Sequence, residues 1–211
     1  MKLTRIFVAL ALTGALAGCM SPTPASRASI EPTGLGMPGA TAPFAAPHYA
    51  VKGITVHVPE TLKVSEANLY YPVADIVWRG DPRGNRYEQV KAIFETAMAE
   101  AAATATRGTP VLLEIEVMRF HAQTEKARYS IGGTFSMKFL LTIRDAATGA
   151  IIDGPRAIDA DTPAAGGERA LTEEAMGITA KVAVTTRLAE VIAAELARPV
   201  ALPGAARVAA N

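Results

Sequence analysis

The segment WRGDPRGNRYEQV, residues 78–90, holds the residue types best suited to binding a ligand. Arg79, Arg83 and Arg86 stand beside the expected start of a helix, where free backbone N–H groups and the helix dipole favour a phosphate or carboxylate. The segment has neither the G-x-x-x-x-G-K-[ST] nor the G-x-G-x-x-G spacing of phosphate loops. A purely structural interpretation is also open, because Asp-Pro and Gly-Asn pairs are typical of turns and caps. The three arginines are therefore a candidate anion-binding site, set against a structural turn.

The other residues that could do chemistry are few and scattered. The chain has no H-E-x-x-H, C-x-x-C, G-x-S-x-G or paired-histidine spacing, and its histidines are His48, His57 and His121. Glu114 and Glu116 lie two apart on an expected strand, which could suit acid–base work but is explained more simply by a solvated sheet face. We therefore expect no catalytic residues, no metal and no cofactor.

The N-terminus reads as an export signal that ends in a lipidation site. Lys2 and Arg5 precede an apolar run of about a dozen residues, too short for a membrane span of about 20. The run ends in Leu-Ala-Gly-Cys, which resembles the lipobox of bacterial lipoproteins. The resemblance implies a signal peptide at 1–18 and acyl chains such as palmitate on Cys19, the only cysteine. The alternative is an ordinary secretory signal.

Composition divides the rest of the chain into a tether, one domain and a tail. Residues 19–48 are rich in Pro, Ala, Gly, Ser and Thr and predict a flexible tether, and residues 198–211 predict a loose tail. Residues 49–197 are long enough for a single domain with a core. The whole chain has 21 Lys and Arg against 20 Asp and Glu, and removing Lys2 and Arg5 leaves a net charge of −1. Such a surface gives no electrostatic reason to expect nucleic-acid binding.

Hydrophobic periodicity predicts the elements of the domain. Alternation predicts strands at 54–58, at 111–120 with a bulge near 117, and at 135–143, with a weaker strand at 75–78. The turn at 145–149 returns the chain as an edge strand at 150–160. A helix capped by Asn85 buries a stripe of apolar residues, Val90, Ile93, Phe94, Ala97, Met98 and Ala101, and is stopped by Gly108 and Pro110.

A long C-terminal helix completes the expected fold. Its apolar stripe comprises Leu171, Ala175, Ile178, Val182, Thr185, Ala189, Ile192 and Leu196. This stripe indicates packing across a sheet, with a partner coiled coil as the alternative. The predicted fold is α+β, a small antiparallel sheet in the order β-α-β-β-β-α with two helices packed on one face.

The aromatic segment before the first helix has two interpretations. Tyr70, Tyr71 and Trp78 lie within nine residues of each other. They could form a docking patch on the surface, or they could close the core.

Two family resemblances bear on function. The segment YYPVADIVWRGDPRGNRYEQVKAIF resembles an uncharacterised, domain-of-unknown-function family of alphaproteobacterial lipoproteins. The turn DAATGAIID, the returning strand and the amphipathic C-terminal helix, over 110–197, resemble the auxiliary lipoproteins of ABC-type lipid-transport systems. Neither resemblance implies catalytic residues.

Together these features predict a non-enzymatic lipoprotein, anchored to the membrane through the acyl chains on Cys19 and facing the periplasm. It would act as an accessory or scaffold subunit of an envelope complex, bound to an envelope protein. The alternative is a small-ligand or lipid-binding module with a groove between the sheet and its helices. Because residue 20 is Met rather than Asp, the sorting rule of enteric bacteria favours the outer membrane over the inner one.

Overall fold

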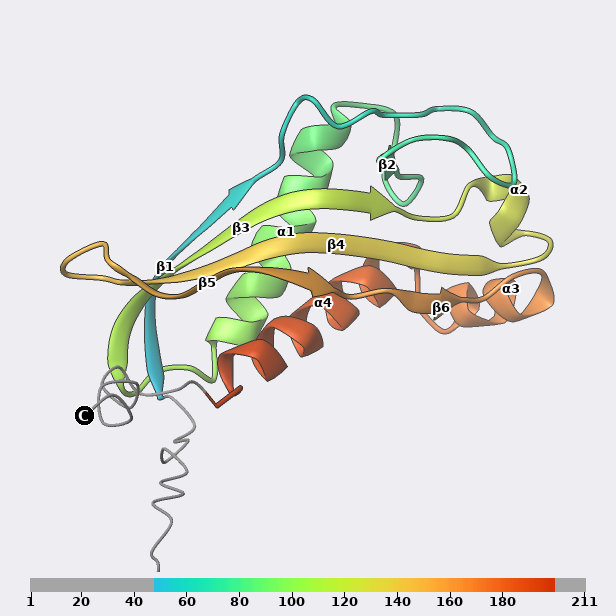
Figure 1. The fold of residues 1–211 in the computed structure, drawn as a ribbon. Helices are drawn as coiled ribbons and strands as arrows, with labels where there is room; N and C mark the ends of the chain where they lie inside the picture. The colour runs from blue at the N-terminus through green and yellow to red at the C-terminus, as the bar shows by residue number, and fades with distance from the viewer. Residues whose placement is uncertain (1–47, 200–211) are drawn as a thin grey trace, which may run out of the picture. The chain divides into compact units, whose positions relative to one another are not determined.

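The computed structural model describes residues 48–199, which fold around one sheet (Figure 1). The predicted signal peptide, Cys19, the tether up to residue 47 and the tail from residue 200 lie outside these residues. Within the described range the elements are β1 (Tyr49–His57), β2 (Ile76–Val77), α1 (Arg86–Ala102), β3 (Thr109–His121), α2 (Glu125–Arg128), β4 (Gly133–Asp145), β5 (Ile151–Asp159), β6 (Thr162–Ala164), α3 (Glu168–Ala175) and α4 (Ala180–Leu196). This is a mixed α+β fold with an open six-stranded sheet and four helices in the described residues.

The sheet is mixed, and the expectation of an antiparallel sheet is wrong on this point. The main strand order is β1-β3-β4-β5, and β1 and β2 both run parallel to β3. A parallel pair needs a crossover, and α1 supplies it. At about 1.5 Å per residue, its 17 residues carry the chain back some 25 Å, so that Thr109 begins β3 beside Tyr49. Alternation of side chains reveals a strand but not its direction.

The antiparallel half of the sheet follows the predicted pattern. β3 pairs with β4 and β4 with β5, and the turn between β4 and β5 has Gly149 at a φ of 71°. The register of β3 against β4 shifts between Val117 and Arg119, which confirms the bulge expected near 117. β5 lies at the edge of the sheet, as expected for 150–160. Short β6 then continues along β4, an element that the predicted order lacks.

Helix α1 begins as predicted and ends earlier. The Asn85 side chain accepts hydrogen bonds from the backbone N–H groups of Tyr87 and Glu88, at 3.0 and 3.3 Å, and the whole predicted stripe is buried. The helix ends at Ala102, before Gly108. Gly108 instead allows the backbone at His48 to pass close to it. Its φ is 119°, and an added Cβ would lie 1.9 Å from the carbonyl oxygen of His48.

The expected long C-terminal helix is two helices, and its packed face agrees with the prediction only in part. Gly177, with a φ of 83°, separates α3 from α4. Leu171, Ile178 and Val182 of the predicted stripe are 54, 41 and 47% exposed. The buried face of α4 is Val184, Leu188, Ile192 and Leu196, so Ile192 and Leu196 of the predicted stripe are buried as expected. Two apolar stripes coexist on this helix, and periodicity alone could not choose between them.

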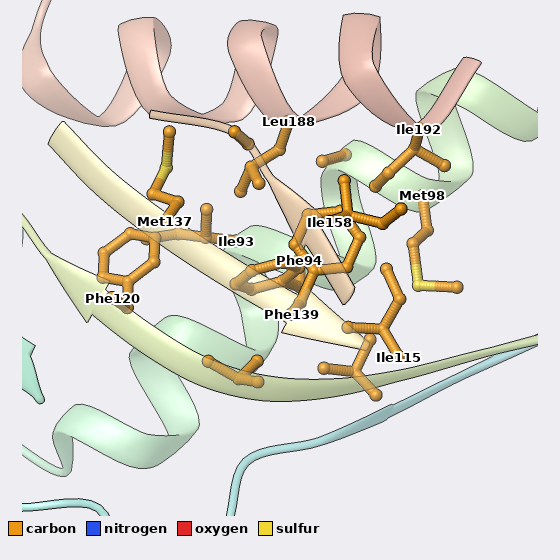
Figure 2. Packing of buried hydrophobic residues seen from close by; sticks show 14 of the residues in the cluster. Ile93, Phe94, Met98, Ile115, Phe120, Met137, Phe139, Ile158, Leu188 and Ile192 are labelled. Atoms are coloured by element: carbon orange, nitrogen blue, oxygen red, sulfur yellow. The ribbon is translucent and has the colours of Figure 1, made fainter. Parts of the chain in front are cut away.

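Helices α1 and α4 cover one face of the sheet, as predicted, and the space between is filled by side chains (Figures 1 and 2). Phe94 sits edge-on to both Phe120 and Phe139, with ring centroids 6.1 and 5.4 Å apart. Trp78, entirely buried, packs edge-on to Phe120 at 5.4 Å. Trp78 therefore belongs to the core.

The two stripes of α4 can be told apart by alanine substitution. Leu188→Ala should lower the free energy of unfolding by about 2–5 kcal/mol, because it opens a cavity among fully buried side chains. Val182→Ala should change it by no more than about 0.5 kcal/mol, because the side chain is half exposed. Urea denaturation of both variants measures the difference. A larger loss for Val182→Ala than for Leu188→Ala would contradict this packing.

Candidate functional site

The candidate arginines Arg79 and Arg86 converge on Glu66, a residue of the long connection between β1 and β2. The Arg86 side chain is only 3% exposed, and its Nε and Nη2 donate to the two Glu66 carboxylate oxygens at 2.7 and 3.2 Å. Its Nη1 donates to the carbonyls of Asp81 and Pro82 and to Gln89. Arg79 also pairs with Glu66. The Glu66 carboxylate thus lies where an external anion would meet these two arginines.

The electrostatics of this cluster follow from its contacts. The hydrogen bond from Arg86, and then the bond and charge of Arg79, lower the pKa of Glu66 to about 2, while partial burial opposes the shift. A carboxylate with so low a pKa stays charged at neutral pH. Its charge neutralises the buried guanidinium of Arg86, which would otherwise be costly to bury.

Arg83, the third candidate, is exposed and makes no side-chain hydrogen bond or ion pair in the described part of the chain. It lines a shallow hollow of about 290 Å³ that also touches Arg79 and Arg86. The structure thus brings Arg79 and Arg86 together around Glu66, whereas Arg83 lies exposed beside the hollow. Anion binding by this trio stays a prediction.

Asp81 fastens the same loop to α4. It accepts a hydrogen bond from the Trp78 indole N–H at 2.8 Å, and Lys181 of α4 donates to its other oxygen at 2.9 Å. Burial raises the pKa of Asp81, but the bonds from Lys181 and Trp78 outweigh it and the pKa lies below its ordinary value. Asp81 therefore links the loop between β2 and α1 both to the buried Trp78 and to α4.

A second polar cluster lies in the connection between the strands predicted at 111–120 and 135–143. Gln123, Thr124 and Arg128 are buried. Thr124 caps the short helix α2 and also donates to the Leu69 carbonyl at 2.8 Å, while Arg128 pairs with Glu174 of α3 at 2.7 Å. No signal marks this segment in the sequence, because polar residues without periodicity normally predict an exposed loop.

Side chains of this second cluster line a cavity of about 190 Å³ that we call the Arg128 cavity. Its walls come from the 78–80 segment, the α2 region, α3 and the start of α4. Its charged and amide side chains are Arg79, Gln123, Glu125, Arg128 and Glu174.

Of the remaining candidates from the sequence, His57, Glu114 and Glu116 line one open hollow on the sheet, with His57 opposite Glu116 in the pair of β1 with β3, and His121 is not among its lining residues. His57 is exposed at the end of β1, whereas a ring nitrogen of His121 lies 3.0 Å from the carbonyl oxygen of Pro72. Glu114 pairs with Arg144 at 2.8 Å and Glu116 is exposed. Within residues 48–199, no three His, Cys, Asp or Glu side chains are grouped to hold a metal ion.

The aromatic segment divides between the two interpretations given for it. Trp78 is a core residue, whereas Tyr70 and Tyr71 are 40 and 81% exposed. The Tyr70 ring lies under the ammonium group of Lys126, 4.5 Å from its centroid. Trp78 thus helps to close the core, whereas Tyr70 and Tyr71 lie on the surface.

An open hollow of about 420 Å³, here called the α4–β6 groove, lies between α4 and the edge of the sheet. Its apolar walls are Phe135, Pro163, Ala164, Ile178, Val182 and Ala183. Arg187 also lines it, and the buried Nε of Arg187 has no hydrogen-bond partner among the described residues. Large exposed apolar side chains beside an unpaired donor are typical of an interaction surface.

The fold and these sites define a small α+β domain with one helical layer, an organised polar end and an open groove. A model of a family of unknown function, DUF6778, matches residues 49–210, and the chain belongs to this family. The expected membership of an uncharacterised family is thereby confirmed. Among curated proteins, none matches the chain.

No helix in residues 48–199 combines the length and apolar character needed to cross a membrane.

Two solved structures are similar to this chain. One is a DUF330-family protein from Xanthomonas campestris, with 10% identity, a TM-score of 0.45, and coverage of 72% of this chain and 86% of that one. The other is a candidate lipoprotein from Caulobacter crescentus, with 14% identity, a TM-score of 0.27, and coverage of 55% and 86%.

Replacing Glu66 tests the arginine cluster. Glu66→Gln should lower the free energy of unfolding at pH 7 by about 1–3 kcal/mol, because it leaves Arg86 buried without a counter-charge. Since the folded pKa lies below the unfolded one, the contribution is full above about pH 4.5 and is lost as the pH falls toward 2. Urea denaturation of wild type and variant between pH 7 and 2.5 measures it.

Glu116→Gln is the matched control, because Glu116 is exposed on the sheet. It should change the unfolding free energy by less than about 0.5 kcal/mol at pH 7. Equal effects of the two substitutions would rule out a special role for Glu66.

Proposed function

We propose that this protein is a lipid-anchored, non-enzymatic accessory subunit of the bacterial envelope, which binds a protein partner through the α4–β6 groove. The anchor is the acylated Cys19 expected from the lipobox, with the domain facing the periplasm and the outer membrane favoured. The single observation that carries the docking role is the exposure of Ile178 and Val182 beside Arg187, whose buried Nε makes no hydrogen bond within the described part of the chain.

The chemistry of the groove indicates what it binds. Ile178 and Val182 offer an apolar surface, so the partner segment should bring apolar side chains. The Arg187 Nε–H finds no acceptor in residues 48–199, and a carbonyl or carboxylate oxygen of the partner would supply one. Pro163 lacks an N–H group, so β6 is a poor template for adding a strand. We therefore propose an apolar polypeptide segment of an envelope protein, held mainly by side chains.

The tether expected at 19–48 would complete the mechanism. Anchoring confines the domain near the membrane, so a partner in the same membrane meets it at a raised effective concentration. A groove of modest affinity can then hold a stable complex. This role needs no reaction chemistry.

The alternative, a lipid carrier with a groove between the sheet and its helices, has less support. The ring of Phe94 and the side chains of Met98, Phe139 and Leu188 occupy that space (Figure 2). Opening a lipid-sized groove there would require separating packed core residues.

The anchor can be tested at Cys19. Cys19→Ala should move the protein from the membrane fraction to the periplasmic or uncleaved pool, because two or three acyl chains, at roughly 0.8 kcal/mol per buried CH₂, are lost. Ser21→Ala, two residues away, should stay in the membrane. Fractionation and intact-mass spectrometry measure both outcomes. An unmodified Cys19 in membrane-bound wild-type protein would sink the proposed anchor.

The groove can be tested by cross-linking in living cells. A photoreactive residue at Ile178 should join the full chain to one envelope protein, and the partner peptide should be apolar. The same residue at Ile152, exposed on β5 away from the groove lining, should give no such adduct. Val182→Glu should reduce the Ile178 adduct at least about tenfold. An adduct equally strong from both positions, or unchanged by Val182→Glu, would contradict docking in the groove.

A further inference from the structure

The Arg128 cavity contains three buried polar atoms without hydrogen-bond partners among the described residues. They are Nε of Arg79, Oε1 of Gln123 and Nη2 of Arg128. Gln123 and Arg128 are only 7 and 8% exposed, and the side chain of Arg79 is 9% exposed. Buried polar groups are normally satisfied, so three in one cavity need an explanation.

The surrounding bonds fix which hydrogen-bonding role each atom has left. The Gln123 amide nitrogen donates to the carbonyls of Ala164 and Ala165, at 3.4 and 3.1 Å, so its Oε1 remains an acceptor. Arg128 uses Nε on Glu174 at 2.7 Å, which leaves Nη2 as a donor. Among the described residues, two donors and one acceptor that make no hydrogen bond thus line the same cavity.

The charges around the cavity are balanced rather than simply positive. The Nε of Arg79 lies 3.4 Å from a carboxylate oxygen of Glu125, an ion pair that is not a hydrogen bond. Arg128 pairs with Glu174, and both acids also line the cavity. Thr179 and Ala180 bring the amino end of α4, a 17-residue helix, to the wall. The helix dipole there adds partial positive charge. A plain anion would meet two carboxylates, whereas a molecule with charges of both signs would find a complement for each.

We propose that the Arg128 cavity binds a small zwitterion. Its carboxylate or phosphate oxygens would accept from Arg128 and Arg79, and its ammonium group would donate to Gln123 and face Glu125 and Glu174. At about 190 Å³, the cavity is smaller than the roughly 300–1,000 Å³ of drug-sized pockets, which limits the ligand to a small molecule or a headgroup. Arg128 and Thr179 also line the α4–β6 groove, but the proposed ligand is a small molecule rather than a polypeptide, so failure of the docking role would not contradict this proposal.

The experiment is calorimetric titration of the full chain, purified in a non-ionic detergent, with phosphoethanolamine, glycine and inorganic phosphate. One of the two zwitterions should bind with 1:1 stoichiometry, and inorganic phosphate should bind at least about tenfold more weakly, because it lacks the ammonium group. Arg128→Lys keeps the charge opposite Glu174 but loses Nη2, and should weaken binding about tenfold or more. Arg169→Gln, which removes an arginine exposed on α3, should leave binding unchanged.

Arg79→Lys gives an independent second variant in case Arg128→Lys does not fold, which circular dichroism would reveal. It should also weaken binding about tenfold, because the Nε donor is lost. Dihexanoyl-phosphatidylethanolamine distinguishes the sources: binding as tight as phosphoethanolamine indicates a lipid headgroup, and exclusion indicates a free small molecule. No binding of either zwitterion at millimolar concentration would overturn the proposal. So would binding unaffected by both arginine substitutions, or phosphate binding as tight as that of the zwitterions.

Discussion

Three guanidinium groups are buried at one end of this domain, and each must find an acid from a distant part of the chain. Arg86 and Arg79 meet Glu66 from the connection between β1 and β2, and Arg128 meets Glu174 from α3. Burying such a charge without a partner would cost several kcal/mol. The pairs therefore constrain a region where regular hydrogen bonding is sparse. They hold the long connection, α2 and α3 against the sheet, and the cavity and the loop at Asp81 depend on that arrangement.

The rest of the domain is held by ordinary burial. One face of the sheet packs on α1 and α4 through a closely packed aromatic and aliphatic interior (Figure 2). Outside that filled interior, the α4–β6 groove and the Arg128 cavity each contain buried polar groups without hydrogen bonds among the described residues. The groove suits a polypeptide and the cavity suits a small charged molecule, so the two proposals concern different partners and different physics.

Much of the fold could be predicted from the sequence because hydrophobic periodicity reports burial. The stripe of α1 from Val90 to Ala101, the bulge near Val117 and the turn at Gly149 all follow from local patterns. The parallel pairing of β1 with β3 could not be predicted, because alternation carries no direction. The choice between two apolar stripes on α4 also failed, because only tertiary packing selects Leu188 over Val182.

The candidate site was less accessible from the sequence. The arginines of 78–90 were visible, but their counter-ion Glu66 lies 13 residues before Arg79 in a segment without periodicity. Arg128 and Gln123 were hidden in a polar stretch, although both are buried. Long-range charge pairing leaves no local pattern, so neither cluster could be assembled before the fold was known.

Solvent exchange of the arginine Nε–H groups, measured by ¹⁵N NMR near neutral pH, tests whether the three arginines are locked at one end of the fold. Assignment would come from single Arg→Lys variants. We predict slow solvent exchange for Arg79, Arg86 and Arg128, and fast exchange for the exposed Arg83 and Arg169. If Arg79, Arg86 and Arg128 exchanged as fast as Arg169, their guanidinium groups would be solvated and could not hold this end of the domain together.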